Sequence, residues 1–208
     1  MSQFQLTVDF TNADLDTLSQ AGESVVLVKM SSSPVGESKA VAWVTFNPFV
    51  TNTVTWVENY GVYASSVVPI QNGTISKLAD TMAYGGQAYD FVDAGHFKGP
   101  NAPTSPLTGN QYQVNNNWSK DPALTFGLAQ DLTVNGKGLL ASPLNAMLVP
   151  AGQNAAFTPL TSVQIFMESA ITTGMVLEDL RSDVTTLTFG TTTNISVRYA
   201  GGKFLQLA

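Results

Sequence analysis

Apolar and polar residues alternate along most of this chain, and this period of two constrains the fold more than any other feature of the sequence. Near the N-terminus, Phe4, Leu6 and Val8 alternate with polar residues. The same spacing recurs at residues 26–30, 42–46, 124–128, 163–167 and 195–199. Successive side chains of a strand point to opposite faces, so each segment is predicted to be a strand with one buried face. The 23 threonines and 21 valines support this prediction, because β-branched side chains suit a pleated sheet.

Turn signals separate the predicted strands. Asn72-Gly73 and Asn135-Gly136 tolerate positive φ, and Gly201-Gly202 lies between two alternating runs, so each pair predicts a hairpin. With 208 residues, of which 44% are hydrophobic, the chain can bury a sizeable core. Many short strands with frequent turns predict an all-β fold, and we expect a single-domain antiparallel β-sandwich over residues 1–208.

Residues 79–111 interrupt the regular pattern. The segment contains Pro100, Pro103 and Pro106, five glycines, several aromatic residues and the only histidine of the chain, His96. We predict one long aromatic, Pro/Gly-rich loop that packs onto the sandwich, with a short strand near residues 89–92. Loops of this length often carry binding sites, and the alternative is that this one covers a sheet edge and binds nothing.

Charge and residue content argue against several classes of partner. The formal net charge is −6, and the nine cationic residues are scattered singly, so no basic stripe is present to bind nucleic acid. The chain has no cysteine and therefore neither a disulfide nor a thiolate metal site. It lacks an apolar stretch long enough to span a bilayer and a secretory leader pattern, so we expect a soluble, cytoplasmic protein without a membrane partner.

Helix is expected only near the N-terminus, where Asn12 is predicted to cap one turn that ends at Leu18. Asn12, Asp14, Asp16 and Glu23 also have the spacing of a calcium loop, although the position that needs glycine is a threonine. A helix cap is therefore the stronger interpretation, and the sequence leaves metal binding open.

Catalytic signatures are weak. With a single histidine and no nucleophile elbow, the sequence offers no nucleophile and base pair for hydrolysis, and we expect a protein that is not an enzyme.

Aromatic residues are the stronger indication of function. Along residues 53–63 the alternation places Glu58 on one face between Trp56 and Tyr60. A carboxylate among apolar neighbours needs either the rim of the sheet or a specific polar partner. Trp118 follows three asparagines, and such an indole can stack on a planar ligand or on a sugar ring. Our candidate ligand-binding residues are Met82, Tyr84, Tyr89, His96 and Trp118, with Glu58 and Tyr60 contributed by the sheet.

Several runs resemble a known family. These are residues 41–49 (VAWVTFNPF), 52–65 (NTVTWVENYGVYAS), 124–130 (LTFGLAQ) and 155–160 (AAFTPL). Together they resemble a family of small all-β proteins of mushroom-forming and other fungi, mostly without assigned function. The family includes a pink chromoprotein of a fruiting body that holds an indolone-type pigment. The shared residues are those of strands and turns, and the resemblance implies a small aromatic chromophore as the ligand.

From the residues and the resemblance together we expect a non-enzymatic small-molecule-binding protein, a chromoprotein that holds a planar aromatic pigment in an apolar pocket. A chain with three Trp, six Tyr, eleven Phe and six Met but only 12% charged residues can supply such a pocket. The alternative is a fruiting-body lectin or defence protein that binds glycans through exposed aromatic and amide side chains. A membrane-active toxin is a third possibility, which the lack of a basic amphipathic helix disfavours.

Overall fold

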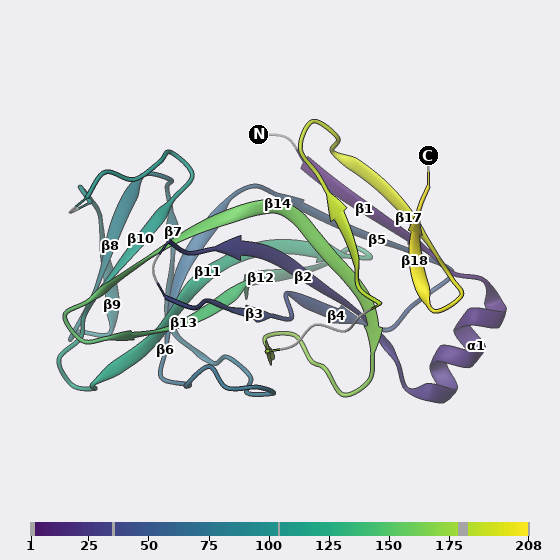
Figure 1. The fold of residues 1–208 in the computed structure, drawn as a ribbon, viewed down its shortest axis with the longest axis horizontal. Helices are drawn as coiled ribbons and strands as arrows, with labels where there is room; N and C mark the ends of the chain where they lie inside the picture. Colours follow the sequence, from purple (N-terminus) through teal and green to yellow (C-terminus); the bar gives the residue numbers. More distant parts are fainter. Residues whose placement is uncertain (1–2, 35, 104, 179–182, 208) are drawn as a thin grey trace.

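Two β-sheets stacked face to face form the protein (Figure 1). The computed structural model describes residues 3–34, 36–103, 105–178 and 183–207. Within these residues, eleven strands belong to the first sheet and seven to the second. The all-β sandwich predicted from the alternation is confirmed.

The first sheet has the order β15-β3-β13-β11-β5-β1-β17-β18. Strands β12 and β6 also pair with β11, and β7 pairs with β6. The bounds of its strands are β1 Gln3–Asp9, β3 Lys39–Val41, β5 Thr51–Val57, β6 Tyr60–Ser65, β7 Lys77–Ala83, β11 Ala123–Val134, β12 Lys137–Pro143, β13 Asn145–Pro150, β15 Val176–Leu177, β17 Asn194–Ala200 and β18 Lys203–Gln206.

The second sheet has the order β4-β2-β14-β10-β8-β9, and β16 pairs with β14. Strand β14 is long enough to pair with both β2 and β10, so it connects the two halves of this sheet. The bounds are β2 Ser24–Ser32, β4 Val44–Phe46, β8 Gln87–Val92, β9 His96–Asn101, β10 Tyr112–Asn117, β14 Asn154–Glu168 and β16 Thr185–Thr188.

The pairing is not antiparallel throughout, which corrects part of the prediction. Strand β1 pairs with β17 in parallel, and β10 pairs with β8 in parallel. Parallel neighbours need long connections instead of tight turns, and local turn signals therefore cannot reveal them.

Residues 79–111 are not one long loop. The end of β7 and the whole of β8 and β9 lie in this segment, and the described residues between 102 and 111 are outside strands. The short strand expected near residues 89–92 is part of β8. Strand β8 buries Tyr89 and Phe91 in the core, so these aromatic residues fill the sandwich from a regular strand.

Two of the three predicted hairpins are confirmed. Asn135 and Gly136 have φ of 49° and 82° between β11 and β12, and Gly201 and Gly202 have φ of 60° and 83° between β17 and β18. Asn72 also has a positive φ, but it lies in the long connection between β6 and β7, where its N–H donates to the carbonyl of Val176.

The helix α1 (Asn12–Ala21) is longer than the predicted turn and is capped one residue earlier, by Thr11. The Thr11 hydroxyl accepts from the N–H of Asp14, whose carboxylate accepts in return from the N–H of Thr11. Asp14 is therefore a capping residue, and the calcium-loop spacing of this segment reflects a helix start.

The main core lies between the sheets. It contains the inward residues of β5, β6 and β11 from one sheet and of β2, β10 and β14 from the other. Strand β2 is apolar on both faces: Val25 and Leu27 belong to the main core, whereas Val26 and Val28 pack in a separate cluster with Phe166. Strands β8, β9 and β10 lie at the end of the molecule opposite α1 (Figure 1).

Candidate functional site

A buried ion pair connects the two sheets. The amine of Lys29, on β2, donates to the carboxylate of Glu58, which lies between β5 and β6. The Lys29 side chain is 1% exposed and that of Glu58 is 30% exposed. A charge is buried at such depth only when it has a partner, so Glu58 compensates the lysine cation.

The break between β5 and β6 brings Glu58 to this position. The N–H of Asn59 donates to the carbonyl of Val57 at 2.7 Å, which forms a tight turn between two strands that both pair with β11. Glu58 accepts from the indole N–H of Trp56 at 2.7 Å and from the hydroxyl of Tyr60. Of the two alternatives that the sequence left for Glu58, the rim of the sheet and a specific polar partner, the structure shows the partner, while the side chain stays partly exposed.

Aromatic rings enclose the lysine amine. The Nζ atom of Lys29 lies 5.6 Å from the ring centroid of Trp43 and 5.3 Å from those of Trp56 and Tyr60. Such distances allow cation–π attraction, which is strongest where water is excluded. We refer to Lys29, Trp43, Trp56, Glu58 and Tyr60 as the Lys29 cluster.

Burial determines the protonation states in this cluster. It lowers the pKa of Lys29 to about 8, and the nearby charge of Glu58 offsets only part of this effect. Burial, with the charge of Glu58 as the second cause, raises the pKa of Tyr60 far above its usual value. At neutral pH the lysine is therefore mostly a cation and the phenol is neutral, so that both donate to the carboxylate.

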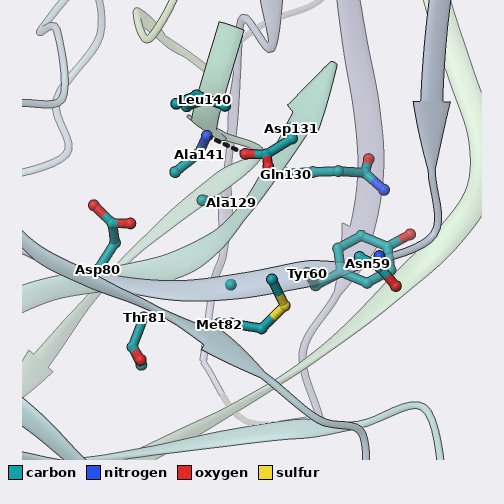
Figure 2. A pocket seen from close by; sticks show the side chains of 11 residues that line it. Asn59, Tyr60, Asp80, Thr81, Met82, Ala129, Gln130, Asp131, Leu140 and Ala141 are labelled. Atoms are coloured by element: carbon teal, nitrogen blue, oxygen red, sulfur yellow. Dashed lines mark hydrogen bonds between the residues drawn. The ribbon is translucent and has the colours of Figure 1, made fainter.

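A pocket of about 250 Å³ adjoins the Lys29 cluster at Tyr60, and we call it the Met82 pocket (Figure 2). Gln130 also belongs to its lining. Its wall combines the start of β6, the end of β7, the middle of β11 and part of β12. Met82 and Leu140 are 60% and 81% exposed and supply apolar surface. On the polar side, the carboxylate of Asp131 accepts from the N–H of Ala141 at 2.6 Å (Figure 2).

Two polar atoms near the Lys29 cluster have no hydrogen-bond partner among the described residues. One is the amide oxygen of Gln130, and the other is the indole N–H of Trp43. The Gln130 amide nitrogen donates to the carbonyl of Val57 at 2.8 Å, which fixes the orientation of the side chain. Both atoms are shielded from solvent, so a ligand in the pocket does not reach them, and they are exceptions to the rule that buried polar groups are paired.

The structure brings together three of the seven predicted site residues. Glu58 contacts Tyr60, and both Tyr60 and Met82 line or adjoin the Met82 pocket. Tyr84, Tyr89, His96 and Trp118 do not line this pocket.

These four residues have other surroundings. Tyr89 is buried and its hydroxyl accepts from the N–H of Tyr84, whose ring is exposed. His96 is exposed at the start of β9. Trp118 is half-buried, stacks on Phe91 with ring centroids 5.5 Å apart, and donates to Asp121 at 2.9 Å. Tyr89 and His96 lie on β8 and β9, whereas Tyr84 follows the end of β7 and Trp118 follows the end of β10, so the four rings do not line one cavity.

Sequence reasoning missed Lys29 and Gln130. Lys29 has the same parity as the inward residues Val25 and Leu27, but β2 is apolar on both faces and its position alone does not indicate burial. For Gln130 the surrounding sequence gives no signal. A polar residue in an apolar run has the same pattern whether its side chain is buried or faces solvent.

The structure was also searched for metal sites and membrane-spanning helices, and the chain was compared with known proteins. In the part of the chain that the structure describes, no group of three or more His, Cys, Asp and Glu side chains is placed to hold a metal ion. No helix among these residues has the length and apolar character that crossing a bilayer requires. Comparisons with family models, with curated proteins and with solved structures give no match for this chain.

Proposed function

We propose that this protein is a non-enzymatic binder of a small planar ring, and that the ligand is an indolone-type pigment held in the Met82 pocket. The proposal includes membership in the family of small all-β fungal proteins that the sequence resembles. The single observation that carries it is the exposed apolar surface of Met82 and Leu140, which line the Met82 pocket.

The chemistry of the pocket favours a flat ligand with one hydrogen-bond donor. Met82 and Leu140 offer apolar, exposed surface for the face of a ring, and the thioether of Met82 packs well against aromatic groups. A ring N–H or O–H group would donate to the carboxylate of Asp131, which lines the pocket and keeps acceptor positions beyond the one that the N–H of Ala141 uses. The volume of about 250 Å³ is slightly below the range of roughly 300–1,000 Å³ for drug-sized ligands, which favours one or two fused rings.

The Lys29 cluster supports binding without turnover. Its lysine, carboxylate and phenol are all engaged with one another, and His96, the only histidine, is exposed on β9 outside this cluster. The proposed role of the cluster is to hold Tyr60 and the β5–β6 break rigid at the wall of the pocket.

Isolation from the native source tests the pigment. We expect visible absorption above the protein band and a native mass greater than that of the bare chain. A colourless protein whose native mass equals the chain mass would contradict the pigment.

Titration of recombinant protein tests the pocket independently of the source. The probe is isatin, a small indole-dione, and the readouts are tryptophan fluorescence and the melting temperature. Met82→Arg should weaken binding at least tenfold, because a cation then occupies the apolar wall. Leu78→Arg is the matched control, since Leu78 is an exposed residue of the same strand outside the pocket. Equal affinity in both variants would place the ligand elsewhere.

A further inference from the structure

A polar hollow on the second sheet is lined by residues of β8, β9, β10 and β14 and by the segments that adjoin them. Strands β8, β9 and β10 lie at the end of the molecule opposite α1 (Figure 1). The volume of the hollow is about 470 Å³, and the side chains that matter for its chemistry are Asp90, Asn101, Asn115, Asn117, Gln153 and Asn154. We propose that this hollow, the Asp90 hollow, is a second binding site and that its ligand is a neutral saccharide. The proposal is independent of the pigment and of the Met82 pocket.

The sheet places the polar side chains in one row. Asp90 on β8 is opposite Asn115 on β10, which is opposite Asn154 at the start of β14. Residues directly opposite one another on neighbouring strands share a face, and adjacent strands lie about 4.8 Å apart. Tyr89 and Val114, which directly precede Asp90 and Asn115 on their strands, point into the core, so the row faces outward.

Hydrogen bonds hold this row in position. One carboxylate oxygen of Asp90 accepts from the amide of Asn115 at 2.6 Å, and the other accepts from the amide of Asn101 at 2.8 Å. Asn115 in turn accepts from the amide of Gln113 at 2.7 Å. The carboxylate is therefore clamped from both sides, and a ligand need not order it on binding.

The clamped groups keep hydrogen-bonding capacity for a ligand. A carboxylate has about four acceptor positions, and an amide nitrogen has two N–H donors. Asp90 uses one position on each oxygen, and Asn101 uses one N–H in its bond to Asp90. Adjacent acceptors and donors of this kind match vicinal hydroxyl groups, each of which can donate to the carboxylate and accept from an amide.

The composition of the hollow argues against other ligands. Its lining contains one carboxylate and no aromatic ring, so it suits neither a hydrophobic planar molecule nor a cation that needs several carboxylates. Anionic ligands are disfavoured because Asp90 would repel them. Lys98 is opposite Asp90 on β9, but it is exposed and belongs to none of the ion pairs found among the described residues.

The alternative drawn from the sequence was a lectin that uses exposed aromatic and amide side chains. In the site proposed here, the asparagines that precede Trp118 contribute without the indole ring. Asn115 and Asn117 line the hollow, whereas Trp118 stacks on Phe91 and lies outside the lining. The saccharide is recognised through hydroxyl groups and not through stacking on the indole.

Binding of the full chain to an array of neutral and acidic oligosaccharides tests the proposal, followed by saturation-transfer NMR with the free monosaccharide of the strongest neutral hit. We expect neutral glycans to bind and sialylated or sulfated glycans to be weaker. Asp90→Asn should reduce affinity at least tenfold. Asp16→Asn removes the same charge from an exposed position on α1 and should leave binding unchanged.

Asn154→Leu is the second variant, in case Asp90→Asn disturbs folding. The Asn154 side chain is exposed and takes part in none of the hydrogen bonds described above, so its replacement should weaken binding at least tenfold without unfolding the sheet. Met82→Arg should have no effect on glycan binding, which separates the two sites. The proposal is overturned if the wild type binds no neutral glycan, if it prefers acidic glycans, or if folded Asp90→Asn and Asn154→Leu proteins bind as the wild type does.

Discussion

Replacing Glu58 by glutamine should destabilise the protein more than removing its partner Lys29. In Glu58→Gln the lysine amine stays in the core, 1% exposed, without a counter-charge. Lys29 donates to no other acceptor among the described residues, so the neutral glutamine oxygen and the rings of Trp43, Trp56 and Tyr60 would be its surroundings. The loss in the free energy of unfolding of this variant therefore measures the cost of burying a cation without a counter-charge.

The structure sets the magnitude for each variant. Removing one partner of a buried ion pair costs about 3–5 kcal/mol, and Glu58→Gln should fall in this range. Lys29→Met should cost about 1–2 kcal/mol, because Glu58 is 30% exposed and keeps the hydrogen bonds from Trp56 and Tyr60. The methionine also retains contact with the three rings, against which its sulfur packs favourably.

Urea unfolding followed by tryptophan fluorescence measures both costs, since Trp43 and Trp56 border the ion pair. The double variant, Lys29→Met with Glu58→Gln, should cost less than the sum of the single variants by at least about 1 kcal/mol. The denaturant slopes must agree for the comparison to hold. If Glu58→Gln cost less than Lys29→Met, or if the two effects were additive, the carboxylate would not compensate a buried cation and the reasoning would be refuted.

Three further predictions concern pH, backbone contact and helix capping. Because burial lowers the pKa of Lys29 from 10.5 to about 8, the unfolded chain binds more protons than the folded chain between these values. The free energy of unfolding should therefore rise by about 2 kcal/mol from about pH 7 to about pH 9.5 relative to Lys29→Met, as measured by urea unfolding at both pH values. Gly127→Ala should destabilise by more than about 3 kcal/mol in a thermal melt, since its Cβ would lie 2.0 Å from the carbonyl oxygen of Asn145; Gly138→Ala, with nothing within 4 Å, should have little effect. Thr11→Ala should lower stability by about 1 kcal/mol and reduce the helical signal in circular dichroism, because it removes the cap of α1.

The strands were predictable from sequence where one face is buried and the other is polar. Strands β1 and β5 alternate strictly, and their inward residues Phe4, Leu6, Val54 and Trp56 all belong to the main core. The parallel pairs β1–β17 and β8–β10 were not predictable, because the partners are far apart in the chain and no local signal records their pairing. Prolines and glycines after residue 98 concealed β9, whose residues are mostly exposed and lack a core face.

The same reasoning explains which part of the candidate site could be found. Glu58 was identifiable because the alternation of β5 continues past its last residue to Tyr60, so a carboxylate between Trp56 and Tyr60 stands out among apolar neighbours. The Met82 pocket could not be identified from the sequence, because it forms where β6, β7, β11 and β12 meet and only the pairing of the strands brings these segments together.

Lys29 shows where alternation fails as a guide to buried charge. Strand β2 has apolar residues on both faces, because Val26 and Val28 are covered by their own cluster while Val25 and Leu27 face the main core. With no polar face for contrast, the position of Lys29 at the end of a valine-rich run is equally consistent with a cation at a strand terminus and with a cation in the core. The acceptor decides between the two, and Glu58 lies between β5 and β6 of the other sheet, 29 residues further along the chain. A buried lysine in a strand with two apolar faces can therefore be predicted only together with an unpaired carboxylate elsewhere in the chain. In this protein the sequence indicated the carboxylate, Glu58, but not the lysine.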